Sequence, residues 1–299
     1  MDLLAIMDMP ENVMKEVISS AITLKKEGNR ARRDLDGKVL ISLYEKPSTR
    51  TRLSFEAAMY NLGGRSIVMD FKSSQLGRGE TMADTARVLS RYGNAISARL
   101  FKHETLMELA KWADAPVINA LTELEHPCQA LADMQTIIEY KKDRGKLVYI
   151  GDAANNVANS IMLVAARYGM HVVLCCPSHF PPNEKYVKAA GKAGARIEVE
   201  HDPVKAVKGA DVVYTDVWVS MGMEAEAEER MKHFLPYQLN GRLLKNAKPD
   251  CIVMHCLPAH RGVEITDEVL DGKNGRAVWD QAENRMWAQE ALLLKLLKG

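Results

Sequence analysis

Short apolar segments alternate with amphipathic segments along most of the chain, and the alternation runs in two series. Apolar runs rich in Val, Ile and Leu are typical of buried strands, whereas apolar residues three and four apart predict helices. Strands that alternate with helices in this way indicate a parallel sheet. The expected strands are residues 38–44, 66–70, 95–101 and 116–121 in the first series, and 147–152, 171–176, 196–200, 211–218 and 251–258 in the second. The expected helices include one after Ser48 and those over residues 80–93, 104–113, 126–142, 156–167 and 184–195.

The charged segment KKDRGK, residues 141–146, separates the two series. A chain of 299 residues, 47% of them hydrophobic, is long enough to build more than one core. We therefore predict an α/β protein with two domains, over residues 1–140 and 146–280, each a parallel sheet flanked by helices. After a strand-like segment at 276–280, the apolar face of residues 284–297 predicts a last helix, which could cap either domain.

Composition narrows the class of partner. Lys and Arg number 40 against 39 for Asp and Glu, so the formal charge of +1 gives no reason to expect nucleic acid or an anionic membrane as a partner. No apolar run approaches the ~20 residues that a membrane-spanning helix needs. The cysteines number five, an odd count, and the N-terminus mixes acids into its apolar residues, unlike a signal peptide. We expect a reduced, cytoplasmic protein.

Hydroxyl and guanidinium groups gather in KPSTRTR, directly after the first expected strand. In a parallel α/β domain, ligands bind outside the carboxyl ends of the strands, where helix N-termini point their N–H groups. The hydroxyls of Ser48, Thr49 and Thr51 can donate hydrogen bonds there. Arg50 adds a planar fork that suits phosphate. A plain serine N-cap with solvated arginines is the commoner arrangement, but a cap needs one hydroxyl, so the interleaved group favours phosphate binding.

The segment HPCQALAD begins another expected helix, after the fourth strand. Pro127 suits the first helical position, so His126 and Gln129 can face one ligand from the helix start. For an isolated pair, an N-capping histidine with a surface glutamine would be the simpler interpretation. The matching position at the end of a strand favours the functional one. Arg99 ends the third strand and would project toward the same edge, although a strand-end arginine is ordinarily solvated.

In the second series, YIGDAANNVANS resembles a degraded dinucleotide-binding fingerprint. Gly151 is in place, but alanines stand where a tight turn prefers glycine, and the next strand lacks the terminal acid that would hold a ribose. An oxidoreductase that uses a nicotinamide cofactor is therefore the weaker hypothesis. Asn155 and Asn156 instead offer amides to a small polar ligand at a helix start, or simply form a turn.

Two later strands end in groups that could meet. Asp216 ends one of them and is followed by a loop that contains Ser220 and Met221, and HCLP places Cys256 and Leu257 at the end of the other. A carboxylate suited to an amine, a thiol and a tight loop would therefore converge at this edge.

The thiol and its neighbours permit two other interpretations. His255, Cys256 and His260 could be metal ligands, but no second Cys/His pair has the spacing of a zinc site, and alternate strand residues point to opposite faces. Cys256 could also be a covalent nucleophile, or simply a buried thiol. We expect no metal.

Taken together, STRTRLSFE, HPCQALAD, DVWVSMG and HCLPAHRG resemble the aspartate/ornithine carbamoyltransferase family over nearly the whole chain. The resemblance implies a carbamoyl-phosphate domain in the first half, completed by a C-terminal helix over residues 281–299, and an amino-acid domain in the second half. It also implies a homotrimer or an assembly of trimers, and no cofactor. The motifs HCLP and SMG favour ornithine over aspartate as the acceptor.

The resemblance also implies which residues contact each substrate. Carbamoyl phosphate would contact Ser48, Thr49, Arg50, Thr51, Gln75, Arg99, His126, Pro127, Cys128, Gln129, Cys256, Leu257 and Arg285. Ornithine would contact Asn156, Asp216, Ser220 and Met221, with Asn155 as a one-residue alternative to Asn156. The catalytic groups would be Arg50, Arg99, His126, Asp216 and Cys256. The loop that carries Gln75 would cross into the phosphate site of a neighbouring subunit.

Overall fold

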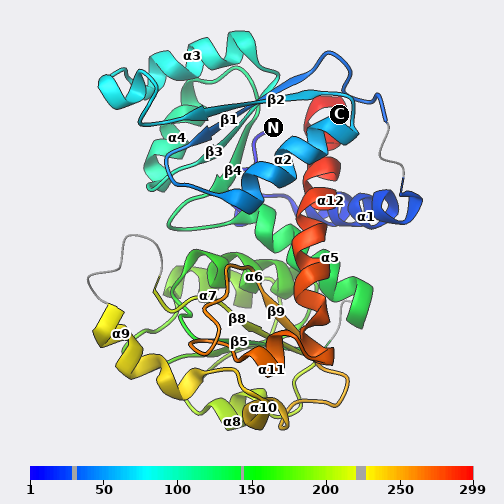
Figure 1. Cartoon of the computed structure of the whole chain (residues 1–299), viewed down its shortest axis with the longest axis vertical. Helices are drawn as coiled ribbons and strands as arrows, with labels where there is room; N and C mark the ends of the chain where they lie inside the picture. Colours follow the sequence, from blue (N-terminus) through cyan, green and yellow to red (C-terminus); the bar gives the residue numbers. More distant parts are fainter. Residues whose placement is uncertain (29–31, 143–144, 220–226, 299) are drawn as a thin grey trace. The chain divides into compact units, whose positions relative to one another are not determined.

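The computed structural model describes residues 1–28, 32–142, 145–219 and 227–298, and it divides the chain into two units. Unit 1 comprises Met1–Gln135 with Asn284–Gly299, and unit 2 comprises Thr136–Glu283. Each unit is built on its own parallel sheet flanked by helices (Figure 1), which confirms the predicted fold class. The end of the chain belongs to unit 1, so the C-terminal helix returns to the first unit, as the family resemblance implied.

Unit 1 holds a parallel sheet with the strand order β2-β1-β3-β4. Its strands are β1 (Val39–Tyr44), β2 (Arg65–Asp70), β3 (Ala95–Arg99) and β4 (Val117–Leu121). In β1, Ile41 and Leu43 belong to the core on one face, while Leu40 and Ser42 are buried on the other. Because successive side chains of a strand point to opposite faces, both faces of the sheet are covered.

The helices of unit 1 close these two faces. They are α1 (Glu11–Glu27), α2 (Thr49–Asn61), α3 (Met82–Tyr92), α4 (His103–Trp112), the short η1 (Leu76–Arg78), the first part of α5 (Pro127–Lys141) and the larger part of α12 (Arg276–Lys298). Leu89 of α3 and Leu106 of α4 join the core that contains Ile41. On α2, the Asn61 side-chain amide donates to the Glu290 carboxylate of α12 at 2.7 Å, which ties the C-terminal helix to unit 1.

Unit 2 holds a five-stranded parallel sheet with the order β7-β6-β5-β8-β9. The strands are β5 (Lys146–Ile150), β6 (His171–Cys175), β7 (Ile197–Glu200), β8 (Val212–Thr215) and β9 (Ile252–His255). Its other elements are α6 (Asn156–Arg167), α7 (Glu184–Lys192), α8 (Pro203–Val207), α9 (Ala227–Phe234), η3 (Leu235–Tyr237), α10 (Gly241–Leu244), α11 (Asp267–Leu270) and η4 (Lys273–Gly275). Val148 and Ile150 of β5 enter one core, and Leu147 and Tyr149 are buried on the opposite face.

Each sheet reverses its strand order at one point. In unit 1, β2 and β3 lie on opposite sides of β1, and in unit 2, β6 and β8 lie on opposite sides of β5. Open α/β sheets bind ligands at this point, outside the carboxyl ends of the strands. In unit 1 these ends carry Ser48 after β1 and Arg99 at the end of β3, and in unit 2 they carry Asn155 after β5 and Asp216 after β8.

The prediction of a strand over residues 276–280 is wrong, because these residues form the first turns of α12. Val278 is buried and Trp279 is 48% exposed, as expected for a helix with one covered face. No Pro or Gly interrupts the sequence from 276 to 298. The helix therefore runs through a short segment whose own residues favour a strand, since tertiary packing overrides so weak a preference.

Two further observations concern the described part of the chain as a whole. None of the five cysteines, all of which are described, takes part in a disulfide. No described helix combines the length and the apolar character that crossing a membrane requires.

Candidate active site

The two arginines at the start of α2, Arg50 and Arg52, differ in their partners. Ser48 is the N-cap, and its side-chain oxygen accepts from the Thr51 backbone N–H at 3.3 Å, so the plain cap is present. Arg52 is exposed and pairs with Glu56 one turn along the helix at 3.0 Å. Arg50 is partly buried and forms no ion pair with any residue that the structure describes. Of the two, Arg50 is therefore the one that can bind an anion, beside the exposed Thr49.

A chain of buried hydrogen bonds joins three elements of unit 1. Arg285 of α12 donates from Nη1 to Gln129 Oε1 at 2.7 Å and from Nη2 to Thr51 Oγ1 at 3.3 Å. Gln129 Nε2 in turn donates to Asp133 Oδ1 at 2.8 Å. The structure thus brings together Thr51, Gln129 and Arg285, which the sequence places 234 residues apart at the extremes. Because Asp133 accepts from the amide nitrogen, the amide oxygen of Gln129 faces Arg285.

His126 is the buried titratable group next to this chain of bonds. It is 4% exposed, and burial, with smaller effects from the positive charges of Arg285 and Arg99, lowers its pKa well below the ordinary value. The imidazole is therefore neutral near pH 7 and can donate one hydrogen bond without adding charge. Burial raises the pKa of Tyr44, which lies near the same arginines, to about 12, so its phenol stays protonated. This end of the sheet is electropositive.

Three other predicted residues of unit 1, Pro127, Cys128 and Gln75, differ in what they can offer to a ligand. Pro127 is the first residue of α5, as its sequence predicted. Cys128 is buried, and its thiol donates to the Asn119 carbonyl at 3.5 Å, so only its backbone is available to a ligand. Gln75 is exposed in the segment after β2, immediately before η1. Its side chain forms no hydrogen bond with the other candidate residues that the structure describes.

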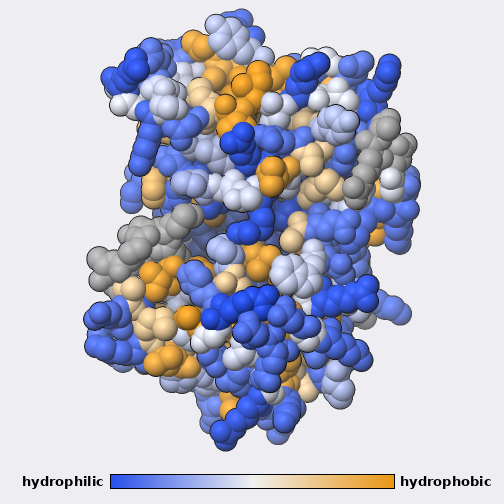
Figure 2. Space-filling view, in the orientation of Figure 1, coloured by the Kyte–Doolittle hydropathy of each residue, from blue (hydrophilic) through white to orange (hydrophobic). Residues whose placement is uncertain are grey.

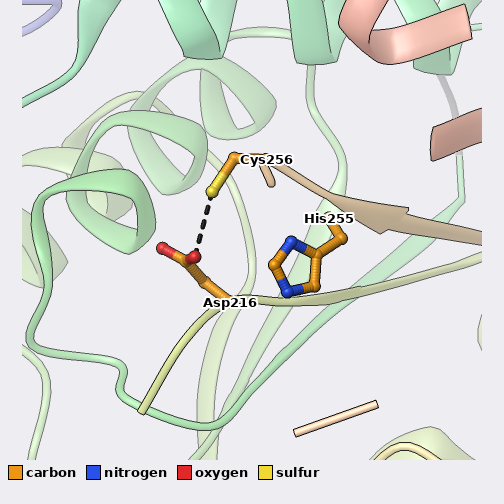
Figure 3. A group of neighbouring side chains, drawn as sticks. All are labelled: Asp216, His255 and Cys256. Atoms are coloured by element: carbon orange, nitrogen blue, oxygen red, sulfur yellow. Dashed lines mark hydrogen bonds between the residues drawn. The ribbon is translucent and has the colours of Figure 1, made fainter. Parts of the chain in front are cut away.

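In unit 2, the ends of β8 and β9 bring a carboxylate and a thiol together. Cys256 Sγ donates to Asp216 Oδ1 at 3.0 Å (Figure 3). The Val217 backbone N–H donates to the same oxygen at 2.8 Å, and Asn155 Nδ2 donates weakly to Oδ2 at 3.4 Å. Burial raises the pKa of Asp216. Among the described residues, no Lys or Arg pairs with this carboxylate.

The two adjacent asparagines have different positions. Asn155 is the N-cap of α6, and its side-chain oxygen accepts from the Ala158 backbone N–H at 2.7 Å. Its amide nitrogen also donates to Tyr149 Oη at 2.8 Å, so its polar groups are engaged within unit 2. Asn156 is the first residue of the helix. Asn155 is therefore bonded within unit 2 and is one of the residues that donate to Asp216.

Asp216, His255 and Cys256 present possible metal-ligand atoms within 4.8 Å of one another (Figure 3). Both ring nitrogens of His255 are engaged, however. Nδ1 accepts from the Leu257 backbone N–H at 2.9 Å, and Nε2 lies 2.9 Å from Glu264 Oε1. A metal ligand must offer a lone pair, and here the lone pair of Nδ1 already accepts a hydrogen bond from the Leu257 backbone N–H. A metal at this place would have to displace the hydrogen bond between Cys256 and Asp216 and those of the His255 ring.

Leu257 and the pair Ser220 and Met221 are further parts of the predicted site. Leu257 has a positive φ of 57°, a backbone conformation that non-glycine residues seldom adopt and that clusters at ligand-binding turns. Ser220 and Met221 lie outside the described residues. Arg230 follows that segment in the sequence and pairs with the buried Asp152. It also donates to the backbone carbonyl of Trp218, which precedes the segment, at 2.7 Å.

Asp133, Glu264 and Arg230 contact residues in or next to the predicted site but were not predicted from the sequence. Asp133 stands four residues after Gln129, and this helical spacing is a signal that could have identified the pair. Glu264 pairs with a histidine nine residues earlier, and Arg230 donates to groups 12 and 78 residues earlier, and no short-range pattern predicts such contacts.

The comparisons with known proteins agree along the whole chain. A model of the carbamoyl-phosphate-binding domain of aspartate/ornithine carbamoyltransferases matches residues 1–139, and a model of the Asp/Orn-binding domain of the same family matches residues 143–296. The ornithine carbamoyltransferase of Pyrococcus abyssi is 52% identical over 306 residues, covering 100% of this chain and 96% of the relative. The anabolic ornithine carbamoyltransferase of Pyrococcus furiosus is 51% identical with the same coverage. A solved structure of ornithine carbamoyltransferase from Pyrococcus furiosus has a TM-score of 0.94 at 51% identity, covering 100% of this chain and 97% of that chain.

The lowered pKa of His126 predicts a pH dependence of stability. Below an ordinary histidine pKa of about 6.5, the unfolded chain binds a proton at this position and the folded chain does not. The free energy of unfolding should therefore be highest above this pH and fall as the pH decreases, by up to about 1.4 kcal/mol per pH unit. Denaturant unfolding at pH 8, 7, 6 and 5 should show a shallower fall for His126→Gln than for wild type. Equal pH dependence in both proteins would contradict a buried, neutral His126.

Proposed function

This chain belongs to the aspartate/ornithine carbamoyltransferase family, and we propose that it transfers the carbamoyl group of carbamoyl phosphate to the δ-amine of L-ornithine. The products are L-citrulline and phosphate. Relatives named ornithine carbamoyltransferase align along the whole chain, which supports this acceptor. One of them is called anabolic, which supports a role in arginine biosynthesis.

The buried carboxylate of Asp216 is the observation that carries the choice of acceptor. Its hydrogen-bond partners in the described structure are a thiol, a backbone N–H and an amide, none of which is a cation. An amine that enters this site can therefore donate a hydrogen bond to the carboxylate and, when protonated, neutralise its charge. The side chain of aspartate would instead bring a second negative charge, which is costly next to a buried carboxylate. The site thus suits ornithine.

Unit 1 supplies the groups for carbamoyl phosphate. The first N–H groups of a helix have no partner within the helix, and together with the helix dipole they attract an anion. Arg50, in this first turn, adds a charge-assisted hydrogen bond to the phosphate. Arg99 and Arg285 increase the positive potential near His126. We assign the phosphate to the start of α2 and the carbamoyl group to Thr51, Arg99 and His126.

The reaction needs no cofactor in this scheme. The lone pair of the δ-nitrogen forms a bond to the carbamoyl carbon, and the electrons of the C=O bond move to oxygen. Neutral His126, with Thr51 and Arg99, donates hydrogen bonds to this oxyanion. When the oxyanion collapses, the C–O bond to phosphate breaks, and phosphate leaves with the bonding electrons near Arg50. The proton lost from the attacking nitrogen ends on the phosphate.

Ornithine in solution carries a protonated δ-amine, which must lose that proton before it can attack. Burial raises the pKa of Asp216, which makes this carboxylate a better proton acceptor than an exposed aspartate. The Cys256 thiol holds Oδ1 of the carboxylate in one orientation. Asp216 therefore receives the proton, positions the neutral amine, and releases the proton to solvent when the products leave. Asn156 and the segment that contains Ser220 and Met221 bind the rest of ornithine.

An acceptor panel tests the proposed function. The protein is incubated with carbamoyl phosphate and, in separate reactions, with ornithine, aspartate, putrescine or N-acetylornithine, and each carbamoylated product is measured by mass spectrometry. Citrulline should form at a rate at least about 100-fold above that of any other product, because only ornithine offers both the δ-amine and a free α-amino-acid group. Preference for aspartate would overturn the acceptor assignment, and the absence of every product would overturn carbamoyl transfer.

We further propose that the enzyme is a homotrimer or an assembly of trimers, located in the cytoplasm. The edge strand β2 and the neighbouring α2 carry exposed apolar side chains, with Leu53 57% exposed, Tyr60 80% and Ile67 53%. Hydrophobic side chains gather over the region of β2 in Figure 2. Such a patch, beside a sheet edge that no described strand pairs with, is a surface that another copy would cover. Gln75 follows β2 and is exposed, which supports the proposal that it acts in the phosphate site of that copy.

Mixed oligomers test this shared site. Arg50→Ala and Gln75→Ala chains should each be weakly active alone and should regain activity when dissociated and reassembled together, because some sites then combine an intact Arg50 with an intact Gln75 from the next chain. A chain with both substitutions, reassembled with wild type, controls for reassembly. If confirmed mixed oligomers show only the average activity of their parents, Gln75 does not act in a neighbouring subunit.

A further inference from the structure

We propose that His255 and Glu264 are positioning residues that hold the turn formed by Cys256 and Leu257 in its substrate-binding conformation. The proposal rests on the proposed function, because it gives this pair a task in the same transfer reaction. Neither residue is among the groups that we assign to the substrates. Both are fully buried, with side chains that expose no surface to solvent.

The partners of His255 fix both the orientation and the protonation of its ring. Nδ1 accepts from the Leu257 backbone N–H at 2.9 Å, so it carries no proton. Nε2 therefore carries the proton and donates a hydrogen bond to Glu264 Oε1 at 2.9 Å. The same carboxylate oxygen accepts from the His260 backbone N–H at 2.6 Å. One His–Glu pair thus holds the backbone on both sides of the turn.

The backbone of this turn needs such support. Leu257 has a φ of 57°, in the left-handed region, where a side chain crowds its own backbone. A residue keeps that conformation only when its surroundings impose it. The hydrogen bond from Leu257 N–H to the side chain two residues earlier provides this constraint. Cys256 lies between the two bonded residues, so the same bond sets the direction of its thiol toward Asp216.

A second series of contacts connects the backbone of His255 to Asp216. The His255 backbone N–H donates to Gln281 Oε1 at 3.0 Å, and Gln281 Nε2 donates to Tyr214 Oη at 3.0 Å. The Tyr214 ring stacks on Tyr149 with centroids 5.4 Å apart. Tyr149 is bonded to Asn155, which donates to Asp216. His255 therefore belongs to the two paths that hold the carboxylate through Cys256 and through Asn155.

Stability alone does not explain why a polar pair occupies this buried position. Taking two ionisable groups out of water is costly, and well-packed apolar residues of similar volume are often equally stabilising. A branched aliphatic pair, however, cannot accept from two backbone N–H groups in a turn. The hydrogen bonds to Leu257 and His260 are what the polar pair adds, and they act on the segment next to Cys256.

Two substitutions of Glu264 separate positioning from packing. Glu264→Gln keeps an oxygen that can accept from His255 Nε2 and His260 N–H, so kcat/KM for ornithine should stay within about threefold of wild type. Glu264→Leu keeps similar bulk but removes the acceptor, and kcat/KM should fall by about 100-fold, as for a small misplacement of reacting groups. His255→Asn is the matched variant, because an Asn oxygen can also accept from the N–H two residues on. It should therefore lose less activity than His255→Leu.

A measurement without substrate keeps the proposal independent of turnover. In protein labelled with ¹⁵N at histidine only, long-range proton–nitrogen NMR spectra should assign to His255 a single tautomer with the proton on Nε2, and Glu264→Leu should allow both tautomers. A proton on Nδ1 in wild type, or unchanged kcat/KM in a folded Glu264→Leu protein, would overturn the proposal. Equal losses in Glu264→Gln and Glu264→Leu would overturn it as well. If wild type makes no citrulline, the proposed function fails, whereas the tautomer result still decides how the turn is held.

Discussion

Asp216 is a buried carboxylate that no Lys or Arg of the described residues neutralises, and the arrangement of unit 2 around β8 follows from the need to hold it. Removing a carboxylate from water is costly, and among the described residues hydrogen bonds from a thiol, an amide and a backbone N–H compensate this cost. The thiol follows the neighbouring strand β9, the amide belongs to the N-cap of α6, and the backbone N–H is that of Val217, the residue after Asp216. A site built in this way is completed by a positively charged or amine-bearing ligand, which is what ornithine supplies.

Unit 1 presents the opposite charge at the corresponding place in its own sheet. Arg285 and Arg99 act together with burial to keep His126 neutral, and Arg50 stands in the first turn of α2 without an acidic partner among the described residues. Such a site attracts an anion and donates hydrogen bonds to an oxygen that gains charge. The complementary charges of the two sites match the two substrates of a carbamoyl transfer, an anionic phosphate ester and an amine.

Local sequence patterns were sufficient for much of this picture. The starts of α2, α5 and α6 follow from Ser48, Pro127 and Asn155, because caps and a first-turn proline act within a few residues. The prediction for residues 276–280 was wrong for the same reason, since it used only local preference where a long helix is held by packing. The contact between Arg285 and Gln129 and the contact between His255 and Glu264 depend on side chains that meet only after folding, and no spacing rule predicts them.

The central claim is that the Asp216 carboxylate accepts and positions the δ-amine, and the steady-state kinetics of Asp216→Asn test it most directly. This substitution keeps the size of the side chain and removes its charge. We expect kcat/KM for ornithine to fall by at least about 100-fold, as for the loss of one preorganised electrostatic group. The affinity for carbamoyl phosphate, measured by calorimetry on the same preparation, should stay close to wild type, because Asp216 is assigned to ornithine alone. A kcat/KM for ornithine close to that of wild type would contradict this role of the carboxylate.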